Sequence, residues 1–170
     1  MLTRRLFAAV LALAAATPAM APPVLAHGPG HPMSGGKMGD ARKVTRVIEV
    51  VATDNAFSLK SLEVKDGETV RFVVRNDGLD PHELLIGTKS EHAEHLKMMR
   101  DMMAAQKKQG GQSGHAHAAP MMQHGSGVMV APGKTESFVW TFARTADLEF
   151  ACDIPGHYED GMRGPIAFAR

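Results

Sequence analysis

The stretch ACDIPGHYEDGM, residues 151–162, contains the one cysteine of the 170-residue chain. Cys152 is followed by His157 and Met162 in the pattern C-x4-H-x4-M. Pro155 and Gly156 predict a tight turn immediately before the histidine. A thiol, an imidazole and a thioether are therefore expected on one short loop.

A lone cysteine cannot form an internal disulfide, which leaves a small buried hydrophobe or a metal ligand as its interpretations. Thiolate and thioether sulfur select Cu(I), and imidazole binds copper in either oxidation state. Structural zinc sites instead use several Cys or His ligands and rarely Met. The residue types favour copper, and a second imidazole would come from His82, in DPHELLIG at the start of a predicted strand.

The first 26 residues predict a cleaved secretory signal peptide. Arg4 and Arg5 precede an apolar run over 6–16, and small residues lead to a cut after Ala26. The apolar run is shorter than the roughly 20 residues that span a bilayer. We expect a monomeric periplasmic protein without a membrane span, in which residues 27–42 form a flexible tail rich in His, Met and Gly and residues 43–170 form one domain.

Short alternating runs separated by turn signals predict an all-β sandwich of about eight strands. The expected strands are 44–53, 57–64, 68–76, 82–87, 127–133, 134–142, 146–152 and 164–170. Between the fourth and fifth runs, residues 88–127 form an insertion of another character. Its first part, 91–109, is helix-like, with Thr88 or Ser90 as N-cap, and 110–127 is loop-like.

A histidine that opens a strand, followed by C-x4-H-x4-M ahead of a final strand, resembles the type 1 copper site of the cupredoxin family. The resemblance covers about residues 44–170 and implies a Greek-key β-sandwich. It implies that His82 and His157 bind copper through imidazole nitrogen, Cys152 through thiolate and Met162 as a weak axial ligand. Glu83 stands where several members of the family have Asn after the first ligand.

Further His and Met residues predict accessory copper sites, because thioethers bind Cu(I) and imidazoles bind Cu(II). On the predicted helix, His92, His95, Met99 and Met102 share one stripe, which either packs on the sandwich or lines a copper route. Cleavage after Ala26 would also allow the amine and imidazole of His27 to chelate Cu(II) together. The accessory candidates are His27, His31, Met33, Met38, His92, His95, Met98, Met99, Met102, Met103, His115, His117, Met121, Met122 and His124.

The His/Met-rich segments make the chain similar to periplasmic cupredoxins linked to bacterial copper tolerance. Copper homeostasis is the first functional hypothesis, with a redox partner or a copper-transport protein as partner. An electron carrier of a respiratory or denitrification chain is the alternative. A net charge of +1 gives no indication of nucleic-acid binding. A single such domain is not expected to be an enzyme, apart from a weak cuprous oxidase activity.

Overall fold

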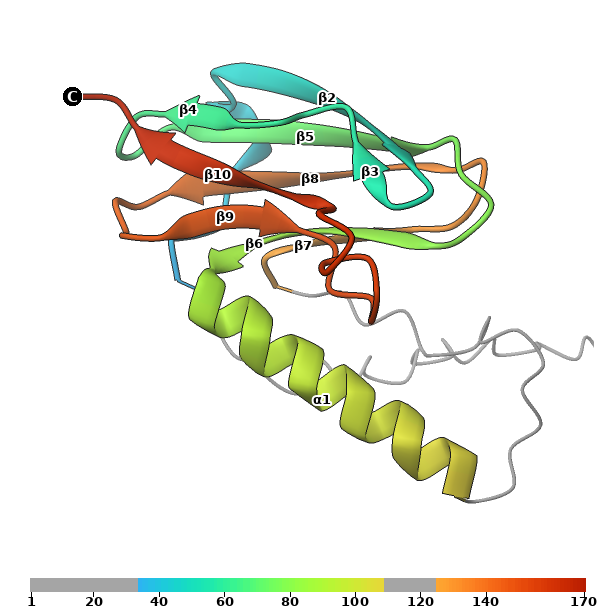
Figure 1. The fold of residues 1–170 in the computed structure, drawn as a ribbon. Helices are drawn as coiled ribbons and strands as arrows, with labels where there is room; N and C mark the ends of the chain where they lie inside the picture. Colours follow the sequence, from blue (N-terminus) through green and yellow to red (C-terminus); the bar gives the residue numbers. More distant parts are fainter. Residues whose placement is uncertain (1–33, 109–124) are drawn as a thin grey trace, which may run out of the picture.

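The computed structural model describes residues 34–108 and 125–170, which form two packed five-stranded sheets (Figure 1). The first sheet has the order β1 (Gly36–Met38), β8 (Thr135–Phe142), β5 (Thr69–Asn76), β2 (Arg46–Thr53) and β3 (Ala56–Phe57). The second has the order β4 (Leu62–Val64), β10 (Arg163–Phe168), β9 (Leu148–Ala151), β6 (His82–Thr88) and β7 (Gly127–Val130). This architecture confirms the predicted sandwich.

The alternating runs form strands because one face of each is buried between the sheets. In β5, Val70, Phe72 and Val74 are fully buried, and they alternate with more exposed residues. The ring of Phe72 stacks on that of Phe138 with centroids 5.0 Å apart. Such apolar burial is the main source of folding free energy.

Two segments differ from the expected strands. The run 57–64 divides into β3 and β4, which belong to different sheets, so this segment crosses between the layers. Residues 36–38, inside the expected tail, form β1 and pair antiparallel with β8. The indole Nε1 of Trp140 donates to the carbonyl of Gly35 at 3.1 Å, which fixes this segment against the sandwich.

The insertion begins with helix α1 (Lys89–Lys108), close to the predicted bounds. Thr88 is the N-cap: the carboxylate of Glu91 accepts the Thr88 N–H at 2.7 Å, and the Glu91 N–H points back to the Thr88 hydroxyl at 3.4 Å. This reciprocal capping box starts the helix at the end of β6. α1 contacts β6 and β9 and then extends past the sheets (Figure 1).

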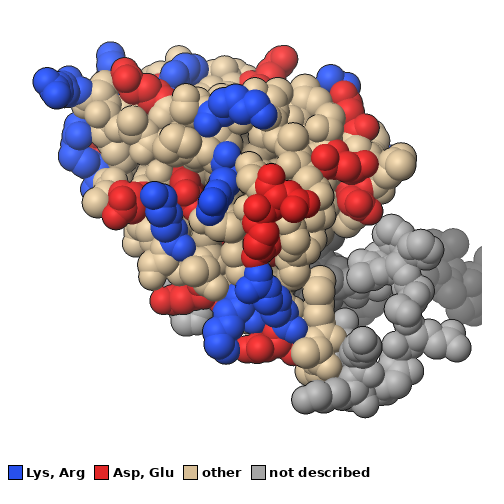
Figure 2. All heavy atoms as spheres, in the orientation of Figure 1, with Lys and Arg blue, Asp and Glu red and all other residues tan. Residues whose placement is uncertain are grey.

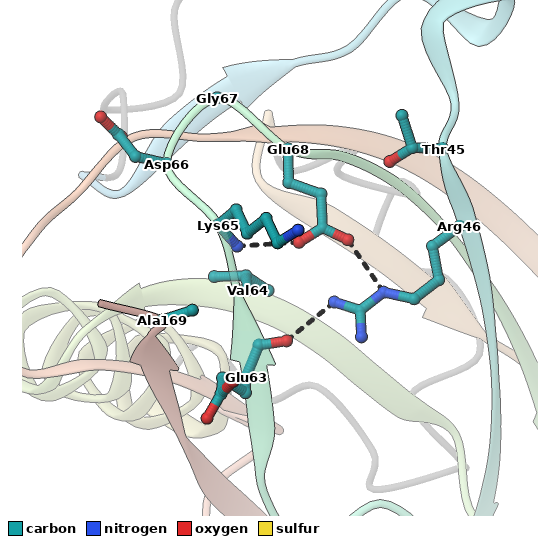
Figure 3. Close-up of a pocket in the computed structure, with 9 residues that line it drawn as sticks. All are labelled: Thr45, Arg46, Glu63, Val64, Lys65, Asp66, Gly67, Glu68 and Ala169. Carbon is teal, nitrogen blue, oxygen red and sulfur yellow. Dashed lines mark hydrogen bonds and ion pairs between the residues drawn. The ribbon is translucent and has the colours of Figure 1, made fainter.

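A hollow of about 590 Å³ lies at the end of the sandwich that carries the last residues of β10 (Figure 3). An ion pair crosses it between Arg46 Nε and Glu68 Oε1, 2.9 Å apart. On the face that Figure 2 shows, basic and acidic side chains are interspersed over the described residues. Among residues 34–108 and 125–170, no helix has both the length and the apolar composition needed to cross a membrane.

Candidate metal centre

The end of the sandwich opposite the hollow brings together three of the predicted ligands. His82 is the first residue of β6, and Cys152 follows the last residue of β9. Because β6 and β9 are antiparallel, the start of one lies beside the end of the other. The loop 153–162 then carries His157 back over this edge before β10 begins.

The loop has the turn that its sequence predicts. The His157 N–H donates to the Ile154 carbonyl at 3.0 Å across Pro155 and Gly156. Gly156 has φ 102°, a left-handed conformation that glycine adopts without strain. Proline followed by such a glycine is typical of a type II turn.

Two further backbone hydrogen bonds close the loop. The Met162 N–H donates to the His157 carbonyl, and the Cys152 N–H donates to the Met162 carbonyl, each at 3.0 Å. Cys152 and Met162 are both fully buried. The three sequence positions of C-x4-H-x4-M are thereby held together by the main chain.

The ligand atoms of His82, Cys152 and His157 all lie within 4.8 Å of one another. The two Nδ1 atoms are 3.2 Å apart, and Cys152 Sγ is 3.5 Å from His157 Nδ1. Metal–nitrogen and metal–sulfur bonds of roughly 2.0–2.3 Å place neighbouring ligand atoms about 3–4 Å apart. Two imidazoles and one thiolate at these separations fit a copper ion.

Met162 is placed next to this cluster by its backbone bonds to Cys152 and His157. Its side chain is fully buried in the core that also contains Cys152. The assignment of Met162 as the fourth, axial ligand stays a prediction.

Burial determines the electrostatics of the cluster. It raises the pKa of the Cys152 thiol to about 12, an effect that the N–H of Glu83, 3.4 Å from Sγ, partly offsets. Burial also lowers the pKa of His82, and the carboxylate of Asp54 offsets part of this effect. The metal-free site therefore holds a protonated thiol and a neutral His82 imidazole at neutral pH.

A buried group of two histidines and an aspartate joins α1 to the loop. His92 Nδ1 lies 2.9 Å from the Asp153 carboxylate, and His95 Nδ1 lies 3.0 Å from it. Burial opposes the charge on Asp153, but these hydrogen bonds outweigh it and lower the pKa of Asp153. We call Asp153, His92 and His95 the helix clamp; it holds α1 against the residue that follows Cys152.

Two surface contacts hold the same loop from opposite sides. Arg100 of α1 forms an ion pair with Glu159, and Asn55 Nδ2 donates to Asp160 Oδ2 at 2.6 Å. Glu159 and Asp160, which lie between His157 and Met162, thus bind the loop to its neighbours. The sequence does not reveal these pairings because the partners are distant along the chain.

The structure separates the accessory candidates of α1 into two groups. His92 is fully buried and the His95 side chain is 11% exposed, so the predicted stripe packs on the sandwich over the first turns. Met99 is half-buried. The second half of the helix exposes its thioethers, at Met98 (41%), Met102 (39%) and Met103 (44%).

The remaining accessory candidates are mostly outside the described residues. Met38 lies on β1 and is 56% exposed. The candidates beyond the described ranges are His27, His31, Met33, His115, His117, Met121, Met122 and His124.

Comparisons with known proteins agree with this geometry. The family model described as copper binding proteins, plastocyanin/azurin family, matches residues 44–169. The copper-resistant cuproprotein CopI of Pseudomonas aeruginosa is 40% identical in an alignment 152 residues long that covers 81% of this chain and 84% of the relative. The copper-resistant cuproprotein CopI of Rubrivivax gelatinosus is 38% identical over 134 residues, 77% of this chain and 71% of the relative.

Among solved structures, auracyanin B matches with a TM-score of 0.56 and 20% identity, over 81% of this chain and 97% of that protein. At this identity the likeness concerns the fold. The matched fold is the two-sheet sandwich that carries His82 and Cys152 at one end.

We predict that copper binding releases about one proton from Cys152. The thiol, with its pKa raised to about 12, is protonated at pH 8–9, whereas copper binds the thiolate. Copper affinity should therefore rise about tenfold per pH unit in this range. Calorimetric titration in buffers of different ionisation enthalpy measures the proton count. Cys152→Ser is the control, and equal heats in all buffers for the unmodified protein would contradict the prediction.

We also predict that His95 stabilises the metal-free protein more at pH 6 than at pH 8.5. Burial lowers the pKa of His95, but Asp153 and the charge of Glu83 outweigh it and raise the pKa above its usual 6.5. Because the pKa of His95 is higher in the folded protein than in the unfolded chain, protonation of His95 stabilises the fold. This contribution is fully present below pH 6.5 and is lost as the pH rises through the folded-state pKa. His95→Gln should lower the free energy of unfolding by about 1–3 kcal/mol at pH 6 and by less at pH 8.5.

Urea unfolding of both proteins at the two pH values measures this difference. Lys97→Gln is the control, because the exposed ion pair of Lys97 with Asp101 lies on the same helix away from Asp153. An equal loss of stability at both pH values for His95→Gln would show that the imidazole carries no charge in the clamp.

Proposed function

Because the chain belongs to the plastocyanin/azurin family of copper-binding proteins, we propose that it is a periplasmic cupredoxin that protects a bacterium against copper. The cluster of His82, Cys152 and His157 carries the proposal, because two Nδ1 atoms and one Sγ converge there. The relatives described as copper-resistant cuproproteins, 38–40% identical, support resistance as the physiological role.

Copper would be held by His82, Cys152 and His157, with Met162 as the fourth ligand. Bound copper would supply one-electron redox chemistry. The chain itself excludes water, since His82, Cys152 and Met162 are fully buried. It also holds the ligand loop through the hydrogen bonds at its base, so the ligand positions change little between Cu(I) and Cu(II).

Accessory copper is proposed for the exposed half of α1. Met98, Met102 and Met103 present thioethers to solvent; Met98 and Met102 are four residues apart, about one helical turn, and Met103 is the residue after Met102. Thioether sulfur prefers Cu(I). His92 and His95 are not free to capture copper without breaking the helix clamp, because both contact Asp153. The His/Met candidates in 27–33 and 110–124 remain part of the prediction.

The braced loop also suits the alternative, an electron carrier. The contacts of Asp160 with Asn55 and of Glu159 with Arg100 restrict movement of the segment that contains His157. A rigid site lowers the rearrangement that accompanies electron exchange. The number of copper ions bound per chain separates the two functions, because a carrier needs one ion and a resistance protein gains from several.

We predict that the protein without residues 1–26 binds more than one Cu(I) per chain. Titration with Cu(II), followed by the visible spectrum, should give one ion with thiolate-to-copper absorption, which Cys152→Ala removes. Titration with Cu(I), which has no such absorption, should give additional ions that survive Cys152→Ala. Replacing Met98, Met102 and Met103 by Leu should reduce the additional Cu(I) and leave the thiolate absorption, because Leu keeps the apolar volume without sulfur.

Val47→Leu is the control, since Val47 is an exposed apolar residue of β2 that has no sulfur. One equivalent of copper in the unmodified protein would favour the electron carrier over copper resistance. The absence of thiolate absorption would contradict the type 1 centre on which both functions depend.

Export is the last part of the proposal. Cleavage after Ala26 would leave a protein that begins at His27. We expect the periplasmic fraction of an expressing bacterium to contain this form, identified by its intact mass. Ala26→Arg should retain the precursor, because the cleavage site requires a small residue. Recovery of the full-length chain from the periplasm would contradict cleavage.

A further inference from the structure

The turn between β2 and β3 lies beside the metal centre. Asp54 and Asn55 make this turn, and Asn55 has φ 64°, which Asn tolerates better than most residues. In the sequence this pair predicts only a turn. In the structure both side chains reach segments that carry copper ligands.

The Asp54 carboxylate collects hydrogen bonds from the segment that precedes β6. It accepts the Leu79 N–H at 2.9 Å and the Asp80 N–H at 3.1 Å. Its Oδ1 atom also lies 3.2 Å from Nε2 of His82. The carboxylate thus contacts the main chain that leads into the ligand and the ligand itself.

The segment closes tightly around this carboxylate. A Cβ atom placed on Gly78 would lie 2.2 Å from Asp54 Oδ1 and 3.0 Å from the Asp54 backbone nitrogen. The contact with Oδ1 is too short, so any larger residue at position 78 would displace the Asp54 carboxylate. The fit indicates that the main chain at Gly78 and the Asp54 side chain form one packed unit.

The two ring nitrogens of His82 have different surroundings. Nδ1 lies 3.2 Å from His157 Nδ1, inside the cluster, whereas Nε2 faces Asp54. When Nδ1 offers its lone pair to a metal, the ring proton is on Nε2, where the carboxylate accepts it. A carboxylate acceptor fixes the tautomer and the ring orientation, and it makes the imidazole a stronger electron donor.

We propose that Asp54 is a positioning residue for the copper centre that holds His82 through Nε2 and favours Cu(II) over Cu(I). A stronger donor and a nearby negative charge stabilise the ion of higher charge more. Asn55 connects the same turn to the ligand loop, because its side chain donates a 2.6 Å hydrogen bond to Asp160. This inference rests on the proposed copper function.

Asp54→Asn tests the role of the charge, because asparagine keeps the size and one acceptor oxygen. Cu(II) affinity should fall about 10–100-fold, the usual loss when such a partner is removed, and Cu(I) affinity should fall less. The reduction potential should therefore rise. Competition titrations with chelators for each oxidation state and voltammetry of the copper-loaded protein measure these changes.

Asp77→Asn is the matched control. It removes the same charge from the β5–β6 segment that Asp54 contacts, but Asp77 pairs with Arg75 rather than with His82. If Asp54→Asn leaves the potential unchanged, or shifts it no more than Asp77→Asn does, the proposal is wrong. Asp54→Glu, which keeps the charge, should shift the potential less than Asp54→Asn.

A second measurement needs no substitution. In the Cu(I)-loaded protein, which is diamagnetic, a proton–nitrogen correlation spectrum should contain a slowly exchanging Nε2–H resonance of His82. Protonation of His82 at Nδ1, or rapid exchange of the Nε2 proton with water, would overturn the proposal even if the variants fail to fold. Failure to bind copper with thiolate absorption would instead refute the proposed function.

Discussion

The backbone hydrogen bond from Cys152 to Met162 closes the loop on which the metal centre depends. It places a buried thiol and a buried thioether residue side by side at the base, and the turn at Gly156 then brings His157 over them. Only His82 comes from outside this loop, and the antiparallel pairing of β6 with β9 brings it to the same edge. Sheet register and loop closure together bring the three side chains of the cluster to one place.

The helix clamp adds buried charge to a small domain, which is costly unless each group is paired. Asp153 is fully buried, yet it contacts both His92 and His95, so its carboxylate is compensated. A hydrophobic contact could bind α1 as strongly but would allow more orientations. The directed hydrogen bonds instead fix the helix relative to the residue next to Cys152, which is where a small displacement would disturb the centre.

Much of the fold follows from local patterns. The alternation in β5 and the Pro155–Gly156 turn are confirmed, and of the two N-caps expected, Thr88 and Ser90, the structure has Thr88. The division of 57–64 between β3 and β4 is not evident, because the run FSLKSLEV contains no Gly or Pro to mark the change of sheet. The roles of Asp54 and Asp153 are likewise hidden, since their partners lie 28 and 58–61 residues away in sequence.

The first turns of α1 are buried and its later turns are exposed. This difference matters for the proposed function, which combines one tightly held copper ion with accessory ones. Its first turns are buried against β6 and β9, where Leu96 is 4% exposed and both histidines of the clamp contact Asp153. Its later turns extend from the sandwich with exposed methionines (Figure 1). Thioethers on a solvent-facing helix can gain and lose Cu(I) without rearranging a core. The clamp therefore keeps the residue next to Cys152 fixed, apart from the exposed methionines for which accessory copper is proposed.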